Sequence, residues 1–268
     1  MNSSYSLHKI DDESQYPFDP NEYSWFKFGD KQYAEKFASE LFEGFIEKYD
    51  DLLLSNKEII ILPSPYLSIP TASNFLCYYF KKRLNSFLYK NNIKASVESK
   101  IYRNQTYVTD YGNLDFEERV KLISNDTYYI DKDFINNKLC IFVDDIKITG
   151  SHEHTVNKIL NQYDVQGDFV FVYFAELTNK TIHPKIENHY NYFAVKNVED
   201  IIDLINRRFF QYNTRIIKFI LKLDEVQFSN LINSIPIDKR NELFHLAISN
   251  NYHQIAEYQN NIEVIKID

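Results

Sequence analysis

The chain has 268 residues, of which 44% are hydrophobic and 16% aromatic, a composition typical of a folded globular protein. Its formal net charge is −8 and its longest basic run is Lys81-Lys82-Arg83, which argues against nucleic acid as a partner. The apolar runs are far shorter than the about 20 residues of a membrane span, and residues 1–15 do not resemble a signal peptide. We therefore expect a cytoplasmic protein with no membrane partner, and reduced core thiols at Cys77 and Cys140.

Short apolar runs alternate with segments of helical periodicity along most of the chain. In chain order the predicted elements are an arm at 1–29, a helix at 30–49 with Asp30 as N-cap, a strand at 58–62, a helix at 72–88, a strand at 95–101, strands at 139–143 and 169–175 separated by a helix at 151–160, a weaker strand at 192–195, and helices at 198–205, 209–223, 224–233 and 238–258. Runs that are apolar on both faces are typical of strands buried in a parallel sheet. The pattern predicts an α/β fold: an open, mainly parallel twisted sheet with helices on both faces, plus an N-terminal arm and helix and a C-terminal helical extension.

Three parts of the chain follow from this pattern. Residues 1–54 form the arm and first helix, 55–205 form the α/β core, and 206–268 form the helical extension.

The most informative stretch runs from Val143 to Ser151, where two carboxylates, Asp144 and Asp145, follow a buried strand. A short turn containing Thr149 and Gly150 then leads into a helix. Ligands of open α/β sheets bind beyond the carboxyl ends of the strands, and a helix N-terminus offers N–H groups suited to a phosphate monoester. Carboxylates beside such a cradle suit ribose hydroxyls, directly or through Mg²⁺.

The same stretch resembles the phosphoribosyl-pyrophosphate (PRPP) motif of type I phosphoribosyltransferases, which is an apolar strand, two acids and a Thr-Thr-Gly turn. Here Ile148 replaces the first threonine, and His152 stands at the position of the final hydroxyl residue. The segments 26–30 and 69–73 also resemble an uncharacterised bacterial phosphoribosyltransferase-like subgroup.

The resemblance implies roles for three segments. The 5′-phosphate would be bound by Lys147, Ile148, Thr149, Gly150 and Ser151, and the pyrophosphate by the glycine-free loop containing Ser64, Pro65, Tyr66, Leu67 and Ser68. Asp144 and Asp145 would orient the ribose and act on Mg²⁺, directly or through water or the ribose. The acceptor pocket would lie under a hood made by the arm, the first helix or the C-terminal helices. Residues 103–131 correspond to the flexible catalytic loop, which would contribute Arg103 and Tyr107.

The implied activity is transfer of ribose 5-phosphate from PRPP to a nitrogenous base or base-like acceptor, with Mg²⁺ as cofactor and PRPP and a small-molecule base as partners. The family is commonly dimeric, so a homodimer is one expected state. The alternative is a catalytically inactive PRPP- or nucleotide-binding regulator, favoured by the glycine-free loop and by Ile148 and His152. A third interpretation, a partner-docking protein that uses its C-terminal helices, has no basic or repeated segment in its favour. A purely structural interpretation of residues 144–151 is an acidic strand end that caps a helix and binds no ligand.

Overall fold

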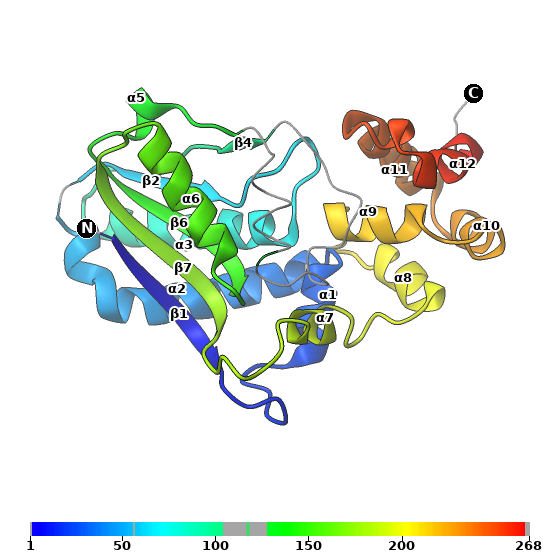
Figure 1. Ribbon diagram of the computed structural model, residues 1–268, viewed down its shortest axis with the longest axis horizontal. Helices are drawn as coiled ribbons and strands as arrows, with labels where there is room; N and C mark the ends of the chain where they lie inside the picture. The colour runs from blue at the N-terminus through cyan, green and yellow to red at the C-terminus, as the bar shows by residue number, and fades with distance from the viewer. Residues whose placement is uncertain (1, 56, 104–116, 118–127, 266–268) are drawn as a thin grey trace.

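The computed structural model describes residues 2–55, 57–103, 117 and 128–265 (Figure 1). A five-stranded sheet lies at its centre, and all neighbouring strands in it are parallel. The strands run in the order β1 (Asn2–Ile10), β7 (Gly167–Leu177), β6 (Lys138–Lys147), β2 (Ile59–Pro63) and β3 (Val97–Glu98). The antiparallel pair β4 (Tyr102–Arg103) and β5 (Tyr128–Tyr129) lies apart from this sheet.

The two faces of the sheet are buried by different helices because successive side chains of a strand point to opposite faces. Ile59 and Ile61 of β2 pack with α2 (Lys31–Leu53) and α3 (Ala72–Lys90). Ile60 and Leu62 pack on the opposite face, in a cluster that includes side chains of α5 (Lys132–Ile135) and α6 (Ser151–Gln162). Burial on both faces explains why the central strands are continuous apolar runs.

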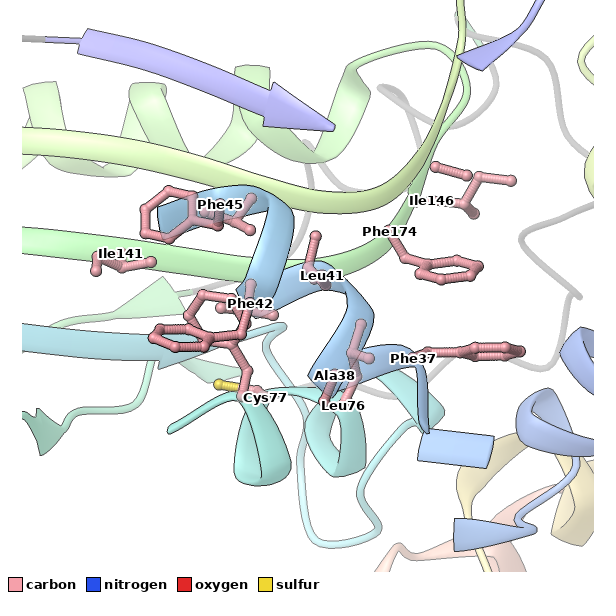
Figure 2. Close-up of a cluster of buried hydrophobic side chains, with 14 of the residues drawn as sticks. Phe37, Ala38, Leu41, Phe42, Phe45, Leu76, Cys77, Ile141, Ile146 and Phe174 are labelled. Atoms are coloured by element: carbon pink, nitrogen blue, oxygen red, sulfur yellow. The ribbon is translucent and has the colours of Figure 1, made fainter. Parts of the chain in front are cut away.

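The core beneath α2 is rich in aromatic side chains. The rings of Phe37 and Phe174 stack with their centroids 4.3 Å apart (Figure 2). Leu41, Phe42 and Phe45 continue the apolar stripe along the same helix. The 3.6-residue periodicity that predicted this helix therefore corresponds to the face it buries, and Asp30 caps it by accepting a hydrogen bond from Gln32 N at 3.1 Å.

The C-terminal helices lie to one side of the sheet and share a core of their own (Figure 1). They are α8 (Val198–Ile205), α9 (Thr214–Leu221), α10 (Glu225–Ser234), α11 (Ile237–Ser249), the short 3₁₀ helix η2 (Tyr252–Gln254) and α12 (Ala256–Ile265). This core also takes in Phe28 and Ile69 from outside the extension. Two further helices, α1 (Pro20–Lys27) and α7 (Ile186–Asn191), lie between the sheet and these helices.

Several predicted elements differ from the structure. The arm contains strand β1 and helix α1, and β1 is an edge strand paired with β7. The strand predicted at 192–195 is wrong, because these residues follow α7 without regular structure and Val195 is buried in the C-terminal core. The strand at 95–101 shrinks to Val97–Glu98.

The C-terminal helix predictions also need two corrections. The helix predicted from 209 begins only at Thr214, after the N-cap Asn213. The single helix predicted over 238–258 is broken near Asn251, whose φ is +58°. Within the described ranges, we find no helix with both the length and the apolar character needed to cross a bilayer.

Candidate functional site

The site begins where strand β6 extends beyond its neighbour. The pairing of β2 with β6 ends with Pro63 opposite Val143, whereas β6 continues beside β7 as far as Lys147 opposite Glu176. The carboxyl end of the sheet is therefore stepped, and Asp144 and Asp145 lie where β6 extends past the end of β2. Crevices of this kind are where α/β sheets bind ligands.

Asp144 is held by two side chains from different elements. Ser64 Oγ donates a hydrogen bond to Asp144 Oδ1 at 2.8 Å, and His152 Nδ1 lies 2.7 Å from Oδ2. Burial opposes ionisation of Asp144, but the charge and hydrogen bond of His152 and the hydrogen bond of Ser64 outweigh it, so the pKa of Asp144 is lowered. Burial also acts to lower the pKa of His152, yet the attraction of Asp144 prevails and that pKa is raised. The imidazole and the carboxylate thus favour each other's charged forms inside the crevice.

Asp145 has partners that were not predicted. Its carboxylate forms an ion pair with Lys27, and Tyr23 Oη donates a hydrogen bond to it at 3.0 Å. The Lys27 and Asp145 side chains are only 9% and 7% exposed. The pKa of Asp145 is raised, first by burial and then by the neighbouring Asp144, although Lys27 acts in the opposite direction. Helix α1 thus delivers a buried cation to the acid pair.

The turn after β6 contains a glycine with a positive φ and leads directly into α6. Gly150 adopts a φ of +77° and caps α6, and a Cβ at this position would meet only Lys147 Cε, at 3.6 Å. Thr149 Oγ1 donates a hydrogen bond to Ser151 Oγ at 3.0 Å. Lys147 Nζ lies 2.7 Å from Glu153 Oε2, while Ile148 is buried in the core beside the sheet. The N-terminus of a twelve-residue helix therefore faces the space beyond the acid pair.

The loop after β2 is fixed by contacts from two sides. Ser73 Oγ of α3 donates to Ser64 Oγ at 2.9 Å, and Lys100 Nζ donates to Leu67 O at 3.1 Å. The backbone N–H groups of Ser68 and Ile69 both donate to Asn250 Oδ1, at 3.1 and 3.3 Å. Asn250 belongs to the C-terminal extension and is 2% exposed, so two amides of this loop are already engaged by another part of the chain.

A cavity of about 800 Å³ connects these segments. The predicted site residues that line it are Ser64, Pro65, Tyr66, Leu67, Arg103, Asp144, Asp145, Lys147, Ile148, Thr149, Gly150 and Ser151. Ser68 is not among the lining residues, and Tyr107 lies outside the described residues. A volume of this size is within the range of small-molecule sites.

The cavity is also lined by residues to which the sequence analysis assigned no binding role. Its other lining residues include Lys27 and His152, Glu187 and Tyr192 at α7, and Arg215, Lys218, Phe219 and Lys222 at α9. The spacing of the three α9 cations, at i, i+3 and i+7, was visible in the sequence and places them on one helix face. Only the tertiary fold shows that this face is turned toward the acid pair.

A family model described as PRTase ComF-like matches residues 1–265. The chain belongs to this family. It has a phosphoribosyltransferase-like α/β fold, as the parallel sheet and the PRPP-type motif had predicted. No match was found among curated proteins.

Two solved structures are similar to the chain at low identity. One is a purine phosphoribosyltransferase from Pyrococcus horikoshii, with 16% identity, a TM-score of 0.31, and coverage of 56% of this chain and 80% of that one. The other is a hypoxanthine phosphoribosyltransferase from Staphylococcus aureus, with 11% identity, a TM-score of 0.32, and coverage of 53% and 74%. Similarity at this level says nothing about a substrate of this ComF-like chain.

Proposed function

We propose that the chain binds PRPP and transfers its ribose 5-phosphate group to a nitrogenous base or base-like acceptor, releasing pyrophosphate. The observation that carries the proposal is the single cavity that brings together the acid pair, the turn at Thr149–Ser151 and the loop after β2. The loop after β2 lies about 80 residues before the acid pair and its turn, and it would not need to meet them if Asp144 and Asp145 only capped a helix.

The 5′-phosphate would lie against the turn from Lys147 to Ser151. Gly150 leaves the space that a phosphate oxygen requires, and the first N–H groups of α6 and the helix dipole favour an anion there. His152 Nε2 is buried and has no hydrogen-bond partner among the described residues. The imidazole therefore offers a further donor to this phosphate, at the position where the family motif has a hydroxyl.

The acid pair would hold the ribose hydroxyls. The partners of both carboxylates fix their orientation before a ligand arrives, which reduces the entropy lost on binding. In the reaction the C1′–N bond to the acceptor forms while the C1′–O bond to pyrophosphate breaks, and pyrophosphate leaves with the bonding electrons. The chain needs no covalent nucleophile for this step, because positioning and charge stabilisation suffice.

Mg²⁺ would enter the site as part of the substrate, bound through oxygens of PRPP. The acid pair is already engaged by Lys27, Tyr23, Ser64 and His152. In the part of the chain that the structure describes, no cluster of three or more His, Cys, Asp or Glu side chains could hold a metal ion. The carboxylates fit water-mediated contact with a substrate-bound cation better than direct coordination.

Pyrophosphate release from PRPP, measured with Mg²⁺ and a panel of purine, pyrimidine and pyridine acceptors, tests the proposal. We expect turnover with at least one acceptor, and a loss of at least about 100-fold in Asp144→Asn, which removes the charge that faces the ribose. A melting curve of the variant must match that of the wild type. Full activity in a folded Asp144→Asn protein would contradict the assigned role of the acid pair.

A second function is favoured by one observation. Because Asn250 engages the amides of Ser68 and Ile69, the loop is not fully available to pyrophosphate. A protein that binds PRPP or a nucleotide as a regulatory signal would tolerate this arrangement. Tight PRPP binding without turnover on any acceptor would favour that function over the enzyme.

A further inference from the structure

Helix α9 separates apolar and basic side chains on its two faces. Its apolar residues, among them Ile216, Ile217 and Ile220, are fully buried in the core of the C-terminal extension. Arg215 and Lys218 line the cavity, and α9 itself (Thr214–Leu221) contains no acidic residue. In a chain of net charge −8, the helix thus contributes a local basic wall to the site.

The basic wall starts next to the loop assigned to pyrophosphate. Thr214 N donates to Pro70 O at 2.9 Å, and Thr214 Oγ1 donates to Ile69 O at 3.0 Å. These bonds anchor the first turn of α9 directly after the loop, with Arg215 as the next residue. The loop and the helix are therefore adjacent walls of one cavity.

The loop itself is a weak anion site. It has no glycine, and the N–H groups of Ser68 and Ile69 donate to Asn250. A diphosphate carries several negative charges, which must be balanced by cations or N–H donors when it leaves water. The Lys100 ammonium group donates a hydrogen bond to Leu67 O, so one of its N–H donors is already used within the protein.

Arg215 is oriented for this purpose by an aromatic ring. Its guanidinium carbon lies 5.5 Å from the centroid of the Tyr192 ring, and Tyr192 also lines the cavity. Two acidic residues, Glu187 and Asp224, face the same space, so the wall is mixed rather than uniformly basic. Lys222 follows α9 and forms an ion pair with Glu257 at 3.2 Å, with side chains 38% and 48% exposed.

We propose that α9 forms the second anion site of the cavity and that Arg215 and Lys218 bind the diphosphate group of PRPP. This inference rests on the proposed function and assigns the C-terminal extension a direct part in ligand binding. It replaces the expectation that the loop after β2 binds pyrophosphate through its own amides. The same cations would also suit an acidic group on the acceptor, and the test separates the two sources.

Isothermal titration calorimetry with PRPP, inorganic pyrophosphate and ribose 5-phosphate, all with Mg²⁺, tests the proposal. Ribose 5-phosphate carries only the 5′-phosphate and serves as the internal reference. We expect Arg215→Gln and Lys218→Gln each to weaken PRPP and pyrophosphate binding by about tenfold or more, because each removes a charged donor. Binding of ribose 5-phosphate should stay within about twofold, since it lacks the diphosphate group that these cations are proposed to bind.

Arg208→Gln is the matched control, because Arg208 is exposed, does not line the cavity and carries the same charge. It should leave all three ligands within about twofold of the wild type. Arg215→Lys, which keeps the charge, should retain most of the PRPP affinity, and retained ribose 5-phosphate binding by Arg215→Gln shows that this variant is folded. The half-buried Lys218 gives an independent second position.

The outcomes are distinct. Unchanged PRPP and pyrophosphate binding in both Gln variants would overturn the inference and leave the proposed function standing. The same would follow if ribose 5-phosphate binding weakened as much as PRPP binding. If the wild-type protein binds none of the three ligands, the proposed function itself fails.

Discussion

Replacing Lys27 with methionine would test whether helix α1 is an energetic part of the site. The change removes the cation from an ion pair whose two side chains are only 9% and 7% exposed. The buried carboxylate of Asp145 then keeps the hydrogen bond from Tyr23 Oη but loses its countercharge. Breaking a buried ion pair by removing one partner costs about 3–5 kcal/mol. For a chain of this size that corresponds to a melting temperature lower by roughly 6–20 °C.

The pH dependence of the Lys27→Met cost has a defined sign. The pKa of Asp145 is already raised by burial and by Asp144, and removal of Lys27 raises it further. Protonation then relieves the unpaired charge, so the loss of stability should be smaller at pH 5 than at pH 8. Urea denaturation at both pH values gives the free energies of unfolding.

Two variants control for this result. Lys36→Met removes a lysine from a more exposed pair with Glu22, whose side chains are 47% and 21% exposed, and should cost about 1 kcal/mol or less. The double variant Lys27→Met/Asp145→Asn removes both charges and should be more stable than Lys27→Met alone. A Lys27→Met protein no less stable than Lys36→Met would refute the reasoning.

Three further changes have expected effects on stability. Gly29 has a φ of +107°, and a Cβ at this position would lie 2.2 Å from Gln211 O. Gly29→Ala should therefore lower the free energy of unfolding by at least about 2 kcal/mol in urea titrations, and a loss below about 0.5 kcal/mol would contradict this close approach. Burial lowers the pKa of His8, so the unfolded state binds the proton at higher pH than the folded state, and wild-type stability should fall as the pH drops below 6.5. In thermal melts from pH 8 to 5, His8→Leu should lose that part of the pH dependence, whereas the control His245→Leu, at an exposed site, should keep it. Asn250→Ala leaves two loop amides without their shared acceptor and should cost about 1–3 kcal/mol by denaturation, so a neutral result would mean that these hydrogen bonds are not formed in solution.

The central strands were predictable because their signal is local. Burial on both faces forces β2, β6 and β7 to be continuous apolar runs, and such runs are visible without knowledge of the fold. The turn at Gly150 was predictable for the same reason, since a strand, an acid pair and a glycine before a helix are neighbours in sequence. Family membership and the parallel sheet confirm this part of the prediction.

The elements that were missed depend on contacts between distant residues. Strand β1 is rich in serine and becomes a strand because the edge of β7 offers it a partner. Residues 192–195 were predicted as a strand because they are apolar, but a short apolar segment can equally bury its side chains within a loop between two helices. Asn250 accepts hydrogen bonds from the backbone N–H groups of Ile69 and Ser68, which lie 181 and 182 residues away, and the sequence around Asn250 contains no pattern that predicts this contact.

At the site, the roles of Lys27 and of the basic face of α9 could not be predicted from the sequence for the same reason, because both depend on contacts between distant residues. Lys27 lies in a segment noted from the sequence, but its role became visible only when α1 was found beside Asp145. The spacing of Arg215, Lys218 and Lys222 fits a solvated helix face equally well. Charged side chains predict that a helix has a polar face and leave open what that face meets.

A crystal structure of the protein with PRPP and Mg²⁺ tests the central claim most directly. We predict the 5′-phosphate within hydrogen-bond distance of the backbone N–H groups of Thr149, Gly150 and Ser151, with the ribose hydroxyls on Asp144 and Asp145. Density for PRPP at another place on the molecule, or a cavity that stays without ligand at saturating concentration, would contradict the account.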